Sequence, residues 1–326
     1  MSISLDLAYY ITKLLNFKGI GPAKVNAMFC DVADETIVHN IKNSAFNESL
    51  FSKFINPDQF NELRKDDLDL VAQFNKLNAV GCDFVTIKSK SYPRQIMRQM
   101  GNSAPPVLFY KGNLKLLKKV AVGFCGSRKA SDVGRIIARD CAKQLVDSSF
   151  ITISGYASGI DQEIHHSTLK NDGSTIIVLP EGILNFKIKK ILENVWDWDK
   201  VLVISQFTPS KRWTSYNAMT RNKTIVSLSS LMVLIESKEK GGSMDAGLAA
   251  LKFNKKLYTP IYEDMPDFAT GNQVLLKKGA FPITAHKNST RPDLTMLFKE
   301  LNAQSKKKCS LPTNHQPLLK FLSDGA

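Results

Sequence analysis

The spacing of apolar residues divides the chain into parts with different patterns. The first part, residues 1–80, has no strand-like alternation. Its apolar residues recur at helical spacing in Leu5–Phe17, and Pro57 predicts the start of a helix that runs toward Leu77. Gly81 follows as a C-terminal stop. Residues 1–80 are therefore expected to form a small, all-helical domain.

From Cys82 the pattern changes, because short β-rich runs alternate with helical segments. Several of these runs are continuously apolar, as is typical of parallel strands covered on both faces. The alternation predicts an α/β fold with a doubly wound, mostly parallel sheet over residues 81–290. The predicted strands are Asp83–Ile87, Val107–Tyr110, Val120–Cys125, Phe150–Ser154, Thr175–Leu179, Val201–Ser205, Leu231–Ile235 and Lys256–Pro260.

Of the predicted helices, the one after the third predicted strand has the clearest sequence signals. Ser131 or Asp132 can cap its N-terminus. Apolar side chains at a spacing of four residues predict its buried face, which consists of Val133, Ile137, Cys141 and Leu145.

The last segment, residues 291–326, has a weaker pattern and is expected to form a short tail or a reduced helical element. Lys306–Lys308 has the composition of a linker, and Gln316–Leu322 fits one short helix. The chain shows no internal repeat.

Composition narrows the class of protein. The chain has 326 residues, of which 43% are hydrophobic and 23% charged, and this excludes a collagen-like, low-complexity or mainly disordered protein. No apolar run approaches the ~20 residues that cross a bilayer. No basic segment precedes the apolar N-terminal residues, which is not the pattern of a secretory signal. The five cysteines are scattered without a CxxC pair, so we expect no disulfide framework or zinc site and a cytoplasmic location.

Charge points to the kind of partner. The chain has 44 Lys and Arg against 30 Asp and Glu, a formal charge of +14, and a basic protein of this kind typically binds a polyanion. Two stretches, Thr86–Lys129 and Gln206–Lys223, contain no acidic residue. Each could be a solvated face, but together they favour a nucleic-acid groove. The second stretch interleaves basic and aromatic residues, and its Trp213 and Tyr216 either stack on bases or pack in the core.

A glycine turn near the N-terminus has two interpretations. Residues 17–25 resemble a helix-hairpin-helix turn, in which Gly19 and Gly21 allow a tight connection and the exposed amides of the second helix hold a DNA phosphate. The alternative is an ordinary helix–helix connection with Pro22 at the first helical position.

Three further glycine turns lie between a predicted strand and a helix, where backbone amides and the helix dipole favour an anion. The first contains Gly126, Ser127 and Arg128; it departs from GxGxxG and no acidic residue follows at the required distance, so NAD is disfavoured. The second is Ser154–Asp161, and the third is Gly241–Ser243. These turns predict a phosphate cradle at the carboxyl edge of the sheet.

The acidic and histidine residues near these turns have alternative roles. Asp161 either caps the following helix or contacts a ligand, and Glu236 either contacts a ligand or braces a loop. Ser154, Asp161 and His165 supply the residue types of a catalytic triad, but there is no nucleophile-elbow pattern, and we expect no catalysis here. No cluster of residues has metal-ligand spacing.

The ordered motifs resemble those of the DNA-processing protein A (DprA/Smf) family over residues 85–285. The matching segments are Tyr92-Pro93, Pro105–Gly112, Gly126–Arg128, Ser154–Asp161, Thr175–Gly182, Arg221–Lys223, Gly241–Ser243 and Gly271–Ala280.

This resemblance implies an extended Rossmann-like domain that binds single-stranded DNA, forms a homodimer, and delivers the DNA to a RecA-type recombinase in transformation, recombination or related DNA processing. It implies no enzymatic activity and no cofactor. The chain departs from the family at Lys223, where an arginine is usual, at Asp245, and in residues 291–326, which are too few for the winged-helix domain of many members. The residues expected to bind DNA or phosphate are Gly126, Ser127, Arg128, Lys129, Ser154, Gly155, Lys211, Arg212, Trp213, Arg221, Asn222, Lys223, Gly242 and Ser243.

A second function also fits the glycine turns and Glu236. It is a Rossmann-like sensor or hydrolase of a nucleotide or nucleotide-sugar. This alternative does not require the acid-free basic stretches, and a protein of this kind should prefer a mononucleotide to an oligonucleotide.

Overall fold

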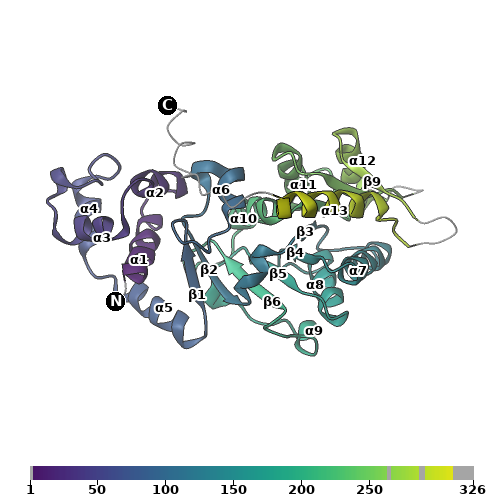
Figure 1. The fold of residues 1–326 in the computed structure, drawn as a ribbon, viewed down its shortest axis with the longest axis horizontal. Helices are drawn as coiled ribbons and strands as arrows, with labels where there is room; N and C mark the ends of the chain where they lie inside the picture. Colours follow the sequence, from purple (N-terminus) through teal and green to yellow (C-terminus); the bar gives the residue numbers. More distant parts are fainter. Residues whose placement is uncertain (1–2, 263–265, 286–290, 311–326) are drawn as a thin grey trace.

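The computed structural model describes residues 3–262, 266–285 and 291–310, and its centre is one mostly parallel sheet (Figure 1). The described strands form a nine-stranded sheet in the order β1-β2-β6-β5-β4-β3-β7-β8-β9. Only β2 runs against its neighbours, β1 and β6. The strands are β1 (Asp83–Thr86), β2 (Val107–Gly112), β3 (Ala121–Cys125), β4 (Ile151–Ser154), β5 (Thr175–Leu179), β6 (Val201–Ser205), β7 (Leu231–Leu234), β8 (Leu257–Pro260) and β9 (Phe281–Ile283).

The predicted α/β class and mostly parallel sheet are confirmed, and each predicted strand is present. The strand order reverses at β3, because β4 lies on one side of it and β7 on the other. The helices are α1 (Ile3–Leu15), α2 (Pro22–Phe29), α3 (Asp34–Asn43), α4 (Pro57–Arg64), α5 (Leu68–Ala79), α6 (Arg94–Met100), α7 (Asp132–Asp147), α8 (Ile160–Lys170), α9 (Lys190–Glu193), α10 (Ser215–Leu228), α11 (Gly242–Lys252), α12 (Thr270–Lys277) and α13 (Thr295–Ser310).

Helices cover both faces of the sheet. Along β5, Ile176 and Val178 join one hydrophobic core, whereas Ile177 and Leu179 join another on the opposite face. The first of these faces is covered by α6, α10, α11 and α12. The other is covered by α7, α8 and α13 and, toward β1, by the N-terminal helices. Burial on both faces explains why these strands are continuously apolar.

The N-terminal helices α1–α5 share a continuous core with the sheet. The ring of Phe74 in α5 lies 6.0 Å from that of Phe109 in β2, centroid to centroid. The prediction of one helix from Pro57 toward Leu77 is wrong, because the chain breaks between α4 and α5. The break occurs at Asp67, whose carboxylate accepts a hydrogen bond from the amide of Leu70 and so caps α5.

Helix α7 begins as predicted, with Ser131 accepting a hydrogen bond from the amide of Gly134. Its buried face differs from the predicted one by one position. Val133 is 54% exposed, while Gly134 and Ala138 are buried together with Cys141 and Leu145. Gly134 leaves room for the Glu236 carboxylate, because an added Cβ would lie 2.2 Å from it, and Ala138 is fully buried. A rule based on large apolar side chains misses such small buried residues.

Helix α13 contains Lys306–Lys308, so the prediction of a linker there is wrong. The helix forms because Leu294, Leu297 and Leu301 pack against the core beside α7. Lysine is itself a good helix former, so a lysine run does not end a helix. The predicted helix Gln316–Leu322 lies outside the described residues. Among the described helices, none combines the length and apolar character needed to span a bilayer.

Candidate functional site

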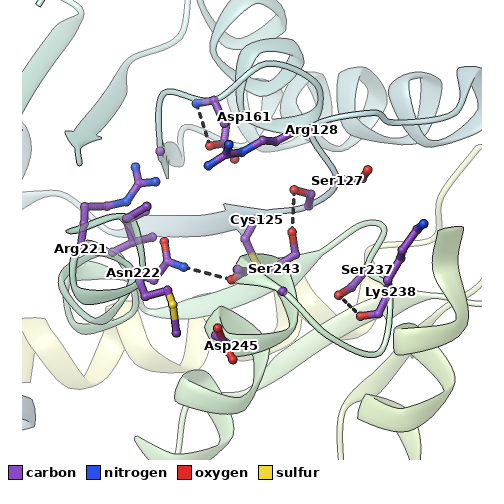
Figure 2. Close-up of a pocket in the computed structure, with 18 of the residues that line it drawn as sticks. Cys125, Ser127, Arg128, Asp161, Arg221, Asn222, Ser237, Lys238, Ser243 and Asp245 are labelled. Atoms are coloured by element: carbon purple, nitrogen blue, oxygen red, sulfur yellow. Dashed lines mark hydrogen bonds between the residues drawn. The ribbon is translucent and has the colours of Figure 1, made fainter. Parts of the chain in front are cut away.

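A cavity of about 510 Å³ lies at the carboxyl ends of β3, β4 and β7, where the strand order reverses. The turns that follow these three strands line it, together with the first turns of α10 (Figure 2). Open α/β sheets bind ligands at this position. The three predicted glycine turns therefore meet at one site.

The first turn carries Gly126, Ser127, Arg128 and Lys129 into the cavity wall. A Cβ atom on Gly126 would lie 2.5 Å from the Ile160 side chain, so only glycine fits. The carbonyl of Ser127 accepts a hydrogen bond from the amide of Ile160 (3.2 Å), which ties the turn to α8. The side chains of Arg128 and Lys129 are exposed and free to reach an anion in solvent.

The second turn is braced by its own polar side chains. The Ser154 hydroxyl is buried, 2.8 Å from both the Phe124 carbonyl and the Asp161 carboxylate. Asp161 also accepts a hydrogen bond from the amide of Ala157 (3.1 Å). Both groups therefore hold the turn. Asp161 is not the helix cap, because Gly159 occupies that position, and its side chain also lines the cavity. Gly155 lines the cavity, and a Cβ there would lie 2.3 Å from the Arg221 guanidinium.

His165 is fully buried beneath the second turn. Its Nε2 lies 2.7 Å from the Gly155 carbonyl and its Nδ1 lies 2.8 Å from the Thr175 hydroxyl. Burial lowers the pKa of His165 to about 4, so the imidazole is neutral near pH 7. Because its partners are Gly155 and Thr175, it does not act on the Ser154 hydroxyl.

The third turn, where α11 begins, is hydrogen-bonded to the first turn and to α10. The Ser243 hydroxyl donates to the carbonyl of Gly126 (2.7 Å), and the Asn222 amide donates to the carbonyl of Gly242 (3.0 Å). Gly241 has φ +117° and precedes α11 without a side-chain cap. The N-terminal amides of this 11-residue helix therefore face the cavity together with the positive end of its dipole.

Glu236 is a structural brace. Its buried carboxylate accepts hydrogen bonds from the amide of Ser131 (3.0 Å) and from the Tyr262 hydroxyl (3.2 Å). It also bonds the Ser131 hydroxyl. Of the two roles expected for Glu236, the structure thus shows the bracing one, which fixes the start of α7.

Arg221 is a buried cation in the wall of the cavity, with 6% of its surface exposed. It donates to the carbonyl of Val178, while its Nε has no hydrogen-bond partner in the described part of the chain. Burial lowers the pKa of Arg221, and the nearby Asp161 carboxylate opposes that shift. The incompletely bonded guanidinium fits an anion bound in the cavity.

The loop before α10 extends the basic surface beyond the cavity. Lys211 and Arg212 in this loop, and Lys223 in α10, are exposed but do not line the cavity. Trp213 is 47% exposed and Tyr216 is 75% exposed, so the core-packing alternative for these aromatics is wrong. Sequence reasoning missed Lys238 and Lys240, which line the cavity; their place just before the third glycine turn was the available signal.

The long acid-free stretch does not form one surface. Lys88 forms a 2.8 Å ion pair with Asp34. Lys118 and Lys119 are exposed just before β3, at the amino end of the strand, whereas the cavity lies at its carboxyl end. Of the basic residues in this stretch, only Arg128 and Lys129 line the cavity.

The N-terminal glycine turn has the predicted form, with Gly19 at φ +80° and Pro22 in the first turn of α2. Asn26 of α2 donates to the carbonyls of Asn102 and Ala104, both at 2.8 Å. These contacts dock α2 on the segment before β2, and a DNA contact at this turn stays a prediction. Among the side chains that the structure describes, no group of His, Cys, Asp and Glu could hold a metal ion.

Comparison with known proteins identifies relatives of this chain. Residues 83–291 match the family model described as DNA recombination-mediator protein A. The chain is 30% identical over 224 residues to the DNA processing protein DprA of Streptococcus pneumoniae, covering 68% of this chain and 76% of that protein. It is 27% identical over 202 residues to the DprA of Bacillus subtilis, covering 61% and 67%.

Solved structures show the same fold. The X-ray structure of DNA processing protein A from Streptococcus pneumoniae superposes with a TM-score of 0.69 at 24% identity, covering 87% of this chain and 96% of that one. A structure of the Helicobacter pylori protein, described for its single-stranded DNA binding mode, superposes with a TM-score of 0.54 at 20% identity, covering 69% and 97%.

Proposed function

Because the chain belongs to the DNA recombination-mediator protein A family, we propose that it binds single-stranded DNA across the carboxyl edge of its sheet. Phosphates of the strand bind the amides and cations of the cavity, among them Arg128 and Arg221. Flanking nucleotides follow the loop that carries Lys211, Arg212 and Trp213. The single-stranded DNA binding described for the Helicobacter pylori relative supports the same ligand here.

One observation carries this proposal: Trp213, in the loop before α10, and Tyr216, in the first turn of that helix, are both exposed beside Lys211 and Arg212. Exposed apolar side chains that lie together in one patch mark an interaction site. Bases stack on such rings while neighbouring cations contact the phosphates. Stacking requires bases that are not already stacked in a duplex, and this favours a single strand over double-stranded DNA.

The polar groups of the second turn support a role in binding without catalysis. A nucleophilic hydroxyl must reach its substrate, but Ser154 is fully buried and does not line the cavity. His165 is also fully buried, and its ring nitrogens are bonded to Gly155 and Thr175. We therefore propose that the protein positions the strand and leaves its covalent bonds intact.

We further propose that the bound strand passes to a RecA-type recombinase and that two copies of the chain act together. The description of the family as a recombination mediator supports the first point. Filament assembly by a RecA-type protein should be faster on strands carrying this protein. Sedimentation of the free protein should give the mass of a dimer.

A specific observation also favours a second candidate, a sensor or hydrolase of a nucleotide or nucleotide-sugar. The cavity occupies the position where doubly wound folds hold nucleotides, and its volume of about 510 Å³ suits such a ligand. This candidate does not explain why the cations and aromatic rings extend beyond the cavity.

Competition binding separates the two functions. A labelled single strand is titrated with the protein, and the complex is then challenged with an unlabelled single strand, its duplex and mononucleotides. We expect the single strand to compete best and mononucleotides weakly. Displacement by a mononucleotide at concentrations equal to those of the oligonucleotide would instead establish the second candidate.

A further inference from the structure

A second, smaller cavity of about 160 Å³ adjoins the first. Arg128, Ala157 and Arg221 line both cavities, so a strand bound in the first would pass the mouth of the second. Its other walls include Tyr156, Glu181 and Trp213. These residues come from the loops after β4, β5 and β6, on the side of the site toward the basic loop.

Glu181 is the one acidic residue in the lining of the second cavity. It follows β5, and its backbone carbonyl accepts a hydrogen bond from the Ser205 hydroxyl (2.6 Å), which fixes the main chain. Its carboxylate has no hydrogen bond or ion pair within the described residues, although two arginines line the same cavity. Burial raises the pKa of Glu181, and no neighbouring cation opposes that shift.

An unpaired carboxylate at a DNA site limits which part of the strand can bind beside it. It repels phosphate, so the second cavity is unsuited to the backbone of the strand. A carboxylate accepts hydrogen bonds and donates none, so its ligand must present N–H or O–H groups. On a DNA strand, the groups that fit this description are the N–H donors of the bases.

The walls of the cavity suit a flat ligand. Trp213 presents a half-exposed indole ring, with the Arg128 guanidinium carbon 5.4 Å from the ring centroid. Tyr156 is held in place, because its hydroxyl donates to the Lys187 carbonyl (3.1 Å) and accepts from the Lys189 amide (3.0 Å). Bases stack on both aromatic rings and guanidinium planes.

We propose that the second cavity takes one base of the bound strand and that Glu181 selects guanine. The carboxylate accepts two parallel hydrogen bonds, one from the ring N1–H of guanine and one from its exocyclic amine. Adenine, cytosine and thymine do not place a ring N–H and an amine side by side on one edge. The inference rests on the proposed function, since the base reaches the cavity as part of a bound strand.

The test compares short oligothymidine strands that differ at one internal position, which is thymine, guanine, inosine, adenine or cytosine. Binding is measured by fluorescence anisotropy for the wild type and for Glu181→Gln, after a thermal melt shows that the variant is folded. Glu193→Gln is the matched control, because it removes an exposed carboxylate on α9 outside both cavities.

We expect the wild type to bind the guanine strand roughly tenfold more tightly than the all-thymine strand. Inosine, which lacks the exocyclic amine, should fall between them. Glu181→Gln should lose this preference while binding the all-thymine strand as tightly or more tightly, because one repulsive charge is gone. Glu193→Gln should keep the preference.

Two results would overturn the inference. Equal wild-type affinity for all five strands removes base selection but leaves single-strand binding intact. A full guanine preference in Glu181→Gln shows that another group reads the base. Failure of the wild type to bind any single strand at low salt would be a different result, because it contradicts the proposed function itself.

Discussion

The guanidinium carbon of Arg128 lies 5.4 Å from the centroid of the Trp213 ring. Arg128 belongs to the first glycine turn, and Trp213 to the exposed loop before α10. This cation–π contact joins the anion-binding cavity to the aromatic surface next to it. A phosphate and a base of one strand can therefore be bound side by side.

Arg128→Ala should weaken single-strand binding by roughly 1.5–3 kcal/mol, because a charge-assisted contact with phosphate is lost. Arg128→Lys keeps the charge without the planar fork and should lose less. Anisotropy titrations of both variants at one salt concentration measure the difference. Wild-type affinity in a folded Arg128→Ala protein would remove this residue from the site.

Trp213→Ala should weaken binding by ~1–3 kcal/mol through loss of stacking. The dependence of affinity on salt should stay almost unchanged, because stacking releases no counterions. Trp213→Phe keeps an aromatic face and is the control. If Trp213→Ala changes the salt slope but not the affinity at low salt, the ring is not a stacking platform.

Gly159→Ala should destabilise the fold. Gly159 has φ +76°, and an added Cβ would lie 2.2 Å from the Ser127 carbonyl oxygen. Gly241→Ala is a matched control, since Gly241 has φ +117° with no atom within 4 Å of the added Cβ. We expect strain of about 1–2 kcal/mol in the control and a larger loss in Gly159→Ala. Urea unfolding compares the two, and equal losses would mean that the close approach of the two turns is unimportant.

Stability should fall in mild acid because of His165. Burial lowers the pKa of His165 to about 4 in the folded protein, whereas the unfolded chain has the ordinary value of about 6.5. Between these values the unfolded state binds more protons, so the free energy of unfolding decreases as the pH falls from about 6.5 toward 4. The full effect is on the order of 3 kcal/mol.

Urea unfolding at several pH values tests this linkage. The wild type should lose stability between pH values of about 6.5 and 5, and His165→Gln should lose much less over the same range because it has no imidazole to protonate. If the two proteins lose stability in parallel, another group is responsible for the acid sensitivity.

The sequence predicts the sheet well because buried parallel strands are apolar on both faces, which is a local pattern. It predicts less well where packing decides the outcome. β9 was not expected, because Phe281–Ile283 contains a proline and is a short edge strand. Lys118 and Lys119 belong to the same acid-free stretch as Arg128. The two lysines lie at the amino end of β3, however, whereas Arg128 lies at its carboxyl end.

The site was predictable in part. Glycine turns after strands can be read from the sequence, and the structure brings all three together. The partners of buried polar groups cannot be read in this way, because they depend on contacts distant in sequence. Ser154 was expected to contact the ligand, but it bonds Phe124 and Asp161. Glu181 gave no signal, since a single carboxylate after a strand is common.

The salt dependence of two double variants tests the central claim, that the single strand follows the carboxyl edge of the sheet. Lys211→Ala with Arg212→Ala removes two cations from the loop at this edge. Lys118→Ala with Lys119→Ala removes the same charge at the opposite end of β3.

Affinity for one labelled single strand is measured at three or more salt concentrations for the wild type and both variants. Each phosphate contact contributes about −0.7 to the slope of log K against log salt. We predict that the Lys211/Arg212 variant flattens the slope by about one unit or slightly more, and that the Lys118/Lys119 variant leaves it unchanged. A wild-type slope in the Lys211/Arg212 variant, or a flattened slope in the Lys118/Lys119 variant, would contradict the claim.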